Sequence, residues 1–141
     1  MGLSFITPIN TCMLDILEKY NRAVTKFKTK EEFNNWMITL GRSLETPDPR
    51  QIRHRENFVK GCQNNAWLCR LNNKLSFDST SEYTKGMGKI LLDVYSSAED
   101  PTKINFIDFR YITQGLSREE ISGFSKMISK IHSLTKEQNS V

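Results

Sequence analysis

The spacing of apolar residues along the chain predicts a series of helices interrupted by one short β segment. In several stretches the apolar residues recur at helical intervals, and residues that cap or break helices bound each stretch. The predicted helices cover residues 13–20, 30–41, 81–95 and 118–131. Thr29 with Glu32, and Ser117 with Glu120, have the spacing of a capping box, which predicts where two of these helices begin.

The middle of the chain has the period of β-strands. Residues 66–71 are apolar on both faces and residues 75–79 alternate, so they predict two strands of a hairpin. Asn72-Asn73 predicts the turn that joins them. Residues 58 and 59 predict a further strand before the hairpin, and the sheet is therefore expected to be antiparallel.

Three other segments complete the map. Pro47 and Pro49 in "ETPDPRQ" predict a connecting loop without regular structure. Asp100-Pro101 predicts the start of a short helix. The polar residues 135–141 predict a C-terminal tail that frays.

These elements predict an α+β fold, with a small antiparallel sheet of about three strands packed against several helices. A chain of 141 residues with 38% hydrophobic and 26% charged residues is typical of one globular domain with its own core. No internal repeat or low-complexity tract divides it. We therefore expect a single domain over residues 1–141.

The charge pattern argues against several classes of partner. The net charge is +4, but the basic residues are spread and are not interleaved with aromatic residues, so a nucleic-acid partner is not expected. No run approaches the roughly 18 apolar residues of a membrane span. The N-terminal segment lacks the features of a secretory signal, so we expect a cytoplasmic protein of a bacterium, or an organellar one whose transit peptide has been removed.

The three cysteines have different surroundings. Their odd number argues against a disulfide framework, and their spacing lacks the close pairs typical of a zinc site. Cys12 near the N-terminus has no predicted role. Cys69 lies between Trp67 and Leu71 in a predicted strand, where burial as a small apolar residue is expected, and Trp67 itself is expected to anchor the core.

Cys62 is placed where a packed thiol is unusual. In "GCQNNAWL" it follows a glycine and precedes three amide side chains, so the sequence predicts a thiol on a flexible connection that moves in and out of shelter. Basic residues stand close to it in the sequence, and we expect them to favour the thiolate. They are Arg53, His54, Arg55 and Lys60.

A thiol without a dedicated base favours sulfur chemistry. Acyl transfer needs a base and an oxyanion site, and neither His54 nor His132 is placed by the sequence as that base. A thiolate attacks a sulfur atom without either requirement, which indicates a sulfur carrier. Two alternatives stay open: an iron–sulfur or metal scaffold, which needs further ligands near Cys62, and a thiol enzyme or redox sensor, which needs a base or a resolving cysteine.

The segment "ENFVKGCQNNAWL" resembles the signature of the SufE family of sulfur acceptors. The matching residues are Asn57, Gly61, Cys62, Gln63 and Trp67. The segments "EEFNNWMITLGRSL", "EYTKGMGKILLDVYS" and "GLSREEISGFSKMISKI" are similar to the family's flanking helices. The resemblance covers about residues 30–131, and several segments in the same order make it specific.

The resemblance implies a SufE/IscU-like fold and a function. Family members take sulfane sulfur from a SufS-type cysteine desulfurase as a persulfide, stimulate that enzyme, and deliver the sulfur to an iron–sulfur scaffold complex of the SufBCD type. Pyridoxal phosphate belongs to the desulfurase, so no cofactor and no stand-alone enzymatic activity are expected here. Carried over to this chain, Cys62 is the persulfide carrier, and Asn57, Gly61 and Gln63 support its loop.

One segment departs from the family pattern. Before the last helix the family tends to read Leu-Ser/Thr-Pro-Ser-Arg, with the arginine associated with partner docking. Leu116 and Ser117 match, but Arg118 stands at the proline and Glu120 at the arginine. A basic group has become acidic, and Arg118 is expected to substitute for it in docking from the neighbouring position. Lys85, which matches the family at the start of the preceding helix, is expected to serve packing or docking.

Overall fold

The computed structural model describes the backbone of residues 11–139 and the side chains of residues 15–137. The expectation of a cytoplasmic location is based on the N-terminal segment, and residues 1–10 of that segment lie outside this part. The last two residues of the predicted C-terminal tail also lie outside it. The predicted α+β class is confirmed, since the described chain forms helices and one two-stranded antiparallel sheet. The α-helices are α1 Thr11–Thr25, α2 Lys30–Arg42, α3 Pro49–Ile52, α4 Glu82–Ser96, α5 Arg110–Thr113 and α6 Arg118–Asn139. The strands are β1 Ala66–Leu71 and β2 Lys74–Ser79, and the short 3-10 turns are η1 Arg55–Asn57, η2 Pro101–Lys103 and η3 Phe106–Phe109.

The predicted capping residues begin their helices. At α6, the Glu120 backbone N–H donates to Ser117 Oγ at 3.2 Å and the Ser117 N–H donates to Glu120 Oε1 at 2.8 Å, which is a complete capping box. At α2, the Glu32 N–H donates to Thr29 Oγ1 at 3.1 Å, but the Glu32 carboxylate accepts from the N–H of Lys28 at 2.7 Å instead of from Thr29. Both helix starts are therefore as predicted, and one box is only half formed.

The hairpin forms where it was predicted, with a tight two-residue turn. Asn72 and Asn73 have φ of 54° and 64°, the left-handed pair that a type I′ turn requires and that asparagine tolerates better than most residues. The expected third strand is reduced to a single bridge between Phe58 and Trp67. The sheet consequently has two full strands.

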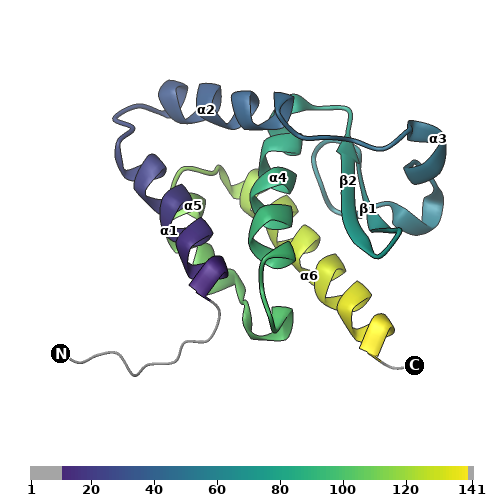
Figure 1. Ribbon diagram of the computed structural model, residues 1–141. Helices are drawn as coiled ribbons and strands as arrows, with labels where there is room; N and C mark the ends of the chain where they lie inside the picture. Colours follow the sequence, from purple (N-terminus) through teal and green to yellow (C-terminus); the bar gives the residue numbers. More distant parts are fainter. Residues whose placement is uncertain (1–10, 140–141) are drawn as a thin grey trace.

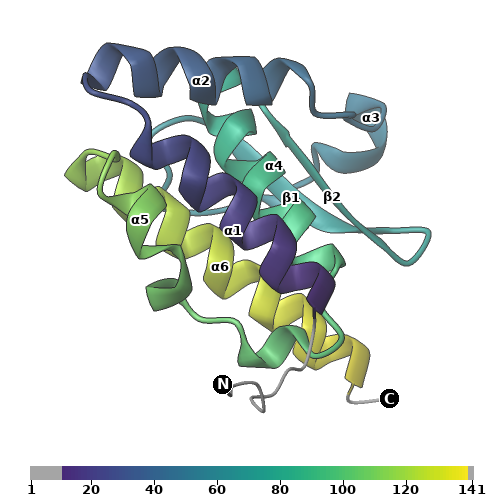
Figure 2. The ribbon, with the colours of Figure 1, turned by 60° about the vertical axis from the view of Figure 1, so that its left-hand side comes forward.

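Helix α4 lies at the centre of the molecule, with α2 crossing its N-terminal end and the hairpin beside it (Figure 1). The crossing is close because glycines face it: a Cβ added to Gly41 would lie 1.8 Å from the Glu82 carbonyl oxygen, and one on Gly86 2.1 Å from that of Met37. α1 packs against α4 and α5, whereas α6 packs against β1 and α4 (Figure 2). Within the described residues, no helix combines the length and apolar character needed to span a bilayer.

Two expectations are wrong, one about the proline-containing loop and one about the C-terminal tail. Pro49 begins the short helix α3, because a proline at the first helical position has no N–H to leave unpaired, and Asp48 caps the helix by accepting from the Arg50 N–H at 2.9 Å. The polar C-terminal segment continues α6 as far as Asn139. Its Thr135 is buried and donates to the Ile131 carbonyl oxygen at 3.0 Å, so the helix keeps a packed face beyond the apolar stripe.

Candidate functional site

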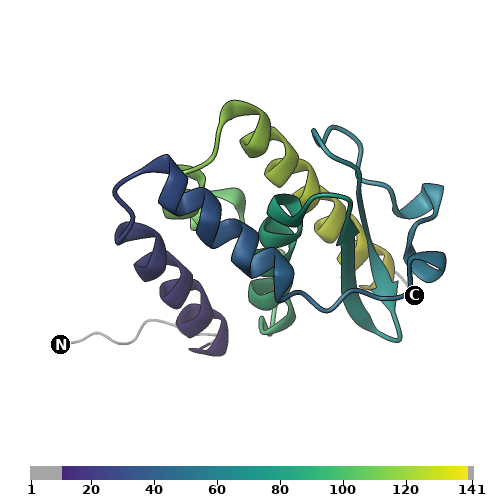
Figure 3. The ribbon, with the colours of Figure 1, turned by 90° about the horizontal axis from the view of Figure 1, so that it is seen from above.

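Cys62 lies in a loop of residues 60–65 that leads into β1 and rests next to the first half of α6 (Figure 3). Gly61 has φ of +93°, a conformation that side chains rarely adopt, and it turns the chain so that Cys62 faces α6. The thiol is half-buried and its Sγ donates to the Gly123 carbonyl oxygen at 3.7 Å. The loop thus presents its sulfur inward, toward the helix.

A small cavity opens beside the Cys62 sulfur. Its volume is about 150 Å³, and α4 and α6 provide most of its walls. The lining residues are Cys62, Gln63, Asn64, Tyr83, Thr84, Met87, Glu119, Glu120 and Gly123. The half-buried Cys62 therefore borders free space between its loop, α4 and α6.

The electrostatic setting of Cys62 differs from the expected one. Burial raises the pKa of the Cys62 thiol to about 11, so the prediction that nearby basic residues favour the thiolate is wrong for this conformation. Arg53 donates to Asp78 at 2.8 Å, the His54 ring bonds a backbone carbonyl of α3, and Arg55 and Lys60 are exposed. Arg53 and His54 are therefore bonded to partners other than Cys62.

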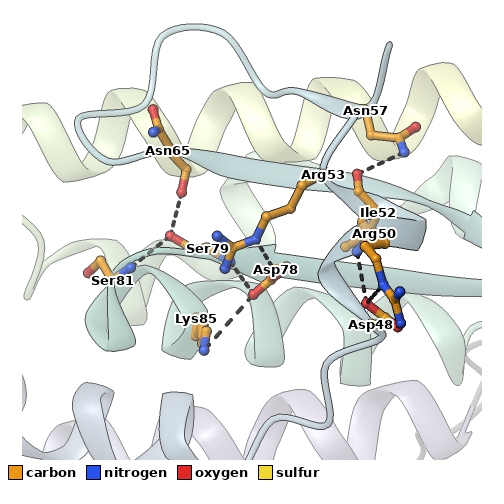
Figure 4. Close-up of polar contacts among 10 residues, drawn as sticks. All are labelled: Asp48, Arg50, Ile52, Arg53, Asn57, Asn65, Asp78, Ser79, Ser81 and Lys85. Atoms are coloured by element: carbon orange, nitrogen blue, oxygen red, sulfur yellow. Dashed lines mark hydrogen bonds and ion pairs between the residues drawn. The ribbon is translucent and has the colours of Figure 1, made fainter. Parts of the chain in front are cut away.

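The base of the loop is held by short hydrogen bonds (Figure 4). The Val59 N–H donates to the Ala66 carbonyl oxygen at 2.9 Å, where the chain enters and leaves the loop. The Asn65 carbonyl oxygen accepts from Ser79 Oγ at 2.6 Å, and the same Oγ accepts from the Ser81 N–H at 3.1 Å. The loop exit is thereby joined to the residue that caps α4.

A buried carboxylate ties the segment before the loop to the hairpin (Figure 4). Asp78 is 2% exposed and accepts from Arg53 Nε at 2.8 Å and from the Ser79 N–H at 2.8 Å, with Lys85 Nζ 3.9 Å away. The Arg53 guanidinium also lies 4.7 Å from the centre of the Trp67 ring. Trp67 is half-buried under this cation instead of lying in the core, and Lys85 belongs to the Asp78 cluster.

The other residues predicted for the site are dispersed. Asn57 Nδ2 donates to the Ile52 carbonyl oxygen at 3.0 Å and shapes the turn before the loop. Gln63 is exposed and lines the cavity. Arg118 is exposed in the first turn of α6 and forms no ion pair with the side chains of residues 15–137. Of the predicted site residues, Cys62 and Gln63 therefore line the cavity, whereas Gly61, Asn57, Lys85 and Arg118 lie outside the lining.

Glu120 is a wall of the cavity that the sequence did not assign to the site. Its Oε1 accepts from Tyr83 OH at 2.9 Å and from Lys30 Nζ at 3.1 Å, in addition to the capping bond. Burial opposes ionisation of Glu120, but the hydrogen bonds from Ser117, Lys30 and Tyr83 together lower its pKa below the ordinary value. The capping-box spacing in the sequence predicted the hydrogen bonds between Glu120 and Ser117. No pattern in the sequence predicted the contacts of Glu120 with α2 and α4.

Cys69 does not contribute to the cavity. It is 6% exposed in β1, so its predicted burial is confirmed. Cys12 lies in the first turn of α1, and its side chain is outside the described part. Among the described residues, no group of three or more His, Cys, Asp or Glu side chains is arranged to hold a metal ion.

Comparison with models of protein families gives a match over most of the chain. The family model described as "SufE: Fe-S metabolism associated domain" matches residues 18–135. The matched range contains the Cys62 loop, the hairpin, α2, α4 and most of α6. The match therefore includes every residue that lines the cavity.

Proposed function

Because the chain belongs to the SufE family and has a role in iron–sulfur metabolism, we propose that it carries sulfur as a persulfide on Cys62. The sulfur donor is a cysteine desulfurase of the SufS type, which holds the pyridoxal phosphate. The recipient is an iron–sulfur scaffold complex of the SufBCD type. The chain acts as one domain and stimulates the desulfurase by removing its product sulfur, without being a stand-alone enzyme.

The transfer is a thiol–persulfide exchange. The Cys62 thiolate attacks the outer sulfur of the desulfurase persulfide, the sulfur–sulfur bond on the desulfurase breaks, and its cysteine leaves as a thiolate. A new sulfur–sulfur bond forms on Cys62, so the reaction needs no external oxidant or reductant. The same exchange, with a thiolate of the recipient as the attacking group, moves the sulfur onward.

The observation that carries the proposal is the cavity in front of Cys62. A persulfide extends the side chain by one sulfur atom at a bond length of about 2.05 Å. The cavity of about 150 Å³ has room for that atom beside the thiol, between α4 and α6. A persulfide held there is partly shielded from solvent reductants, because Cys62 is half-buried, and a carrier needs such shielding between two partners.

The raised pKa implies that the closed loop is a resting state. With a pKa of about 11, the seated Cys62 is almost entirely protonated at neutral pH, and a protonated thiol is a poor nucleophile. Cys62 therefore has to leave its seat on α6 before it attacks. Docking of the desulfurase at the loop is the event that draws it out.

The remaining predicted residues have supporting roles in this proposal. Gly61 and Asn57 shape the loop, and Gln63 lines its cavity. Arg118 is the better of the two docking candidates, because it is exposed next to the cavity residue Glu119, whereas the Lys85 side chain is 25% exposed and lies beside Asp78.

The test measures sulfur on the intact protein. The chain is mixed with a SufS-type desulfurase and L-cysteine in the absence of reductant, and its mass is determined. Wild type should gain the mass of one sulfur atom, Cys62→Ser should gain none, and the matched control Cys69→Ser should behave as wild type. Full stimulation of the desulfurase by Cys62→Ser would show that the carrier assignment is wrong.

A further inference from the structure

Two long side-chain hydrogen bonds hold the tip of the Cys62 loop within the described chain. One joins Cys62 Sγ to the Gly123 carbonyl oxygen at 3.7 Å, and the other joins Asn64 Nδ2 to Thr84 Oγ1 at 3.4 Å. Both lie at the long end of their range, so each is weak. We propose that Thr84 is a positioning residue, which holds the loop closed through the Asn64 carboxamide and so sets how often Cys62 leaves its cavity.

The Thr84 side chain is held in a fixed position at the start of α4. It is 3% exposed, and it lies in the first turn of α4, where its N–H donates to the capping Ser81 Oγ at 3.2 Å. Within the described residues, Asn64 is the side chain that hydrogen-bonds the Thr84 hydroxyl. A buried hydroxyl is costly to leave without a partner, so the closed loop satisfies a group that cannot move to find another.

The loop has a fixed point directly beside the Thr84 contact. Asn65 is held by Ser79 Oγ at 2.6 Å, whereas the neighbouring Asn64 is exposed and reaches Thr84 only through its side chain. Gly61 supplies the flexible backbone at the other end. Residues 61–64 therefore move as a short flap whose closed position depends on the Asn64–Thr84 contact.

The position of the flap controls the chemistry of the thiol. In the closed loop the sulfur faces a carbonyl oxygen, and the titratable groups around its cavity are Tyr83 from α4 with Glu119 and Glu120 from α6. None of these favours a thiolate. Two lysines belong to the surroundings of the loop: Lys126, whose stem lies under Gly61, and the exposed Lys60, two residues before Cys62. Opening the flap moves Cys62 into water and restores ordinary thiol reactivity. The consequence for sulfur transfer rests on the proposed function, but the flap itself does not.

The test uses alkylation of the full chain by iodoacetamide, with no partner present. The rate at Cys62 is followed by peptide mass mapping, which separates it from Cys12 and Cys69. Thr84→Val keeps the shape but removes the acceptor, and we expect about a fivefold faster reaction, the effect of losing one neutral hydrogen bond. The pH midpoint of the reaction should fall by about 0.7, because the closed state holds the thiol proton less of the time.

Matched variants distinguish the loss of the Asn64–Thr84 hydrogen bond from a general loosening of the structure. Thr84→Ser should react at the wild-type rate, since it keeps the hydroxyl, and Asn64→Ala should match Thr84→Val. The double variant should be no faster than either single one, because both remove the same contact. Thr135→Val, another buried threonine on the far part of α6, should leave the rate unchanged.

Several results would overturn the proposal. An unchanged rate in both Thr84→Val and Asn64→Ala would do so, as would multiplying effects in the double variant or an equal acceleration by Thr135→Val. Failure of the carrier function is seen separately: Cys62 would then take up no sulfur from a desulfurase, whatever the alkylation rates are.

Discussion

The base and the tip of the Cys62 loop are adjacent in sequence and are held very differently. At the base, Asn65 and Val59 are fixed by hydrogen bonds of 2.6 and 2.9 Å, next to the buried Asp78 cluster. At the tip, Cys62 and Asn64 make contacts of 3.7 and 3.4 Å. A rigid frame with a weakly held tip allows one side chain to move without loosening the fold.

The difference explains why the two described cysteines have different prospects for chemistry. Burial raises the pKa of both thiols. Cys69 is in a strand paired along its whole length, so its exposure requires breaking the sheet. Cys62 reaches solvent when the flap opens. Reactivity here depends on the free energy of a local opening and not on the exposure seen in the closed structure.

Removing the buried carboxylate of the base should have the largest effect on stability. Asp78→Ala leaves Arg53 without its partner, and we expect the free energy of unfolding in urea to fall by about 2–3 kcal/mol, at the low end for a buried pair because the Arg53 side chain is 34% exposed. Glu18→Ala, which removes an exposed pair with Arg22, is the control and should cost about 0.3–0.5 kcal/mol. If Asp78→Ala also accelerated Cys62 alkylation in the folded protein, base and tip would not be independent.

Replacing the loop glycine should have an intermediate effect and act on the tip. Gly61→Ala places a side chain at φ of +93°, which costs about 1–2 kcal/mol, and its Cβ would lie 3.1 Å from the Lys126 stem. Urea unfolding and Cys62 alkylation are measured together, and the alkylation rate should rise because the strained loop closes less often. The double variant Gly61→Ala/Lys126→Ala removes the steric contact alone. A full recovery in that variant would contradict backbone strain as the cause.

Neutralising Glu120, which lines the cavity, should have the smallest effect on the free energy of unfolding. Glu120→Gln keeps an acceptor oxygen for Ser117 and Tyr83, so the loss at pH 7 should be about 1 kcal/mol or less. The folded pKa of Glu120 is lowered, so the charge contributes stability above the ordinary value of 4.5, and this is lost as the pH falls through the folded pKa.

The two proteins should therefore converge in stability in acid. Urea unfolding of wild type and Glu120→Gln is compared at pH 7 and at about pH 3, with Glu119→Gln as the control for an exposed carboxylate on the same turn. A difference that persisted or grew in acid would show that the ionised carboxylate is not what stabilises this corner.

Much of the fold was readable because the signals are local. The capping box of Ser117 and Glu120 and the turn at Asn72-Asn73 depend on residues within a few positions of each other, and both form as predicted. The errors occurred where a local rule has two outcomes. A proline is compatible both with an irregular loop and with the first position of a helix. Pro49 begins a helix because Asp48 caps that helix.

The electrostatics of the site were not readable, because they depend on partners far apart in the sequence. Arg53 was expected to support the Cys62 thiolate, but it pairs with Asp78 on the hairpin. Glu120 was read as a lost docking arginine, and the fold uses it to join α6 to Tyr83 and Lys30. Each of these pairs forms only when the helices and the hairpin pack together, so no residue spacing along the chain predicts it.

By itself, the sequence determined the four longer helices α1, α2, α4 and α6, the hairpin, the flexible glycine, the thiol that follows it and the family to which the chain belongs, because each of these is encoded in short runs of neighbouring residues. Only the tertiary structure decided that this thiol faces α6 over a cavity, is protonated there, and is retained by a contact between Asn64 and Thr84. The physical reason is that burial and hydrogen-bond partners are properties of packed surfaces, which exist once distant segments have come together.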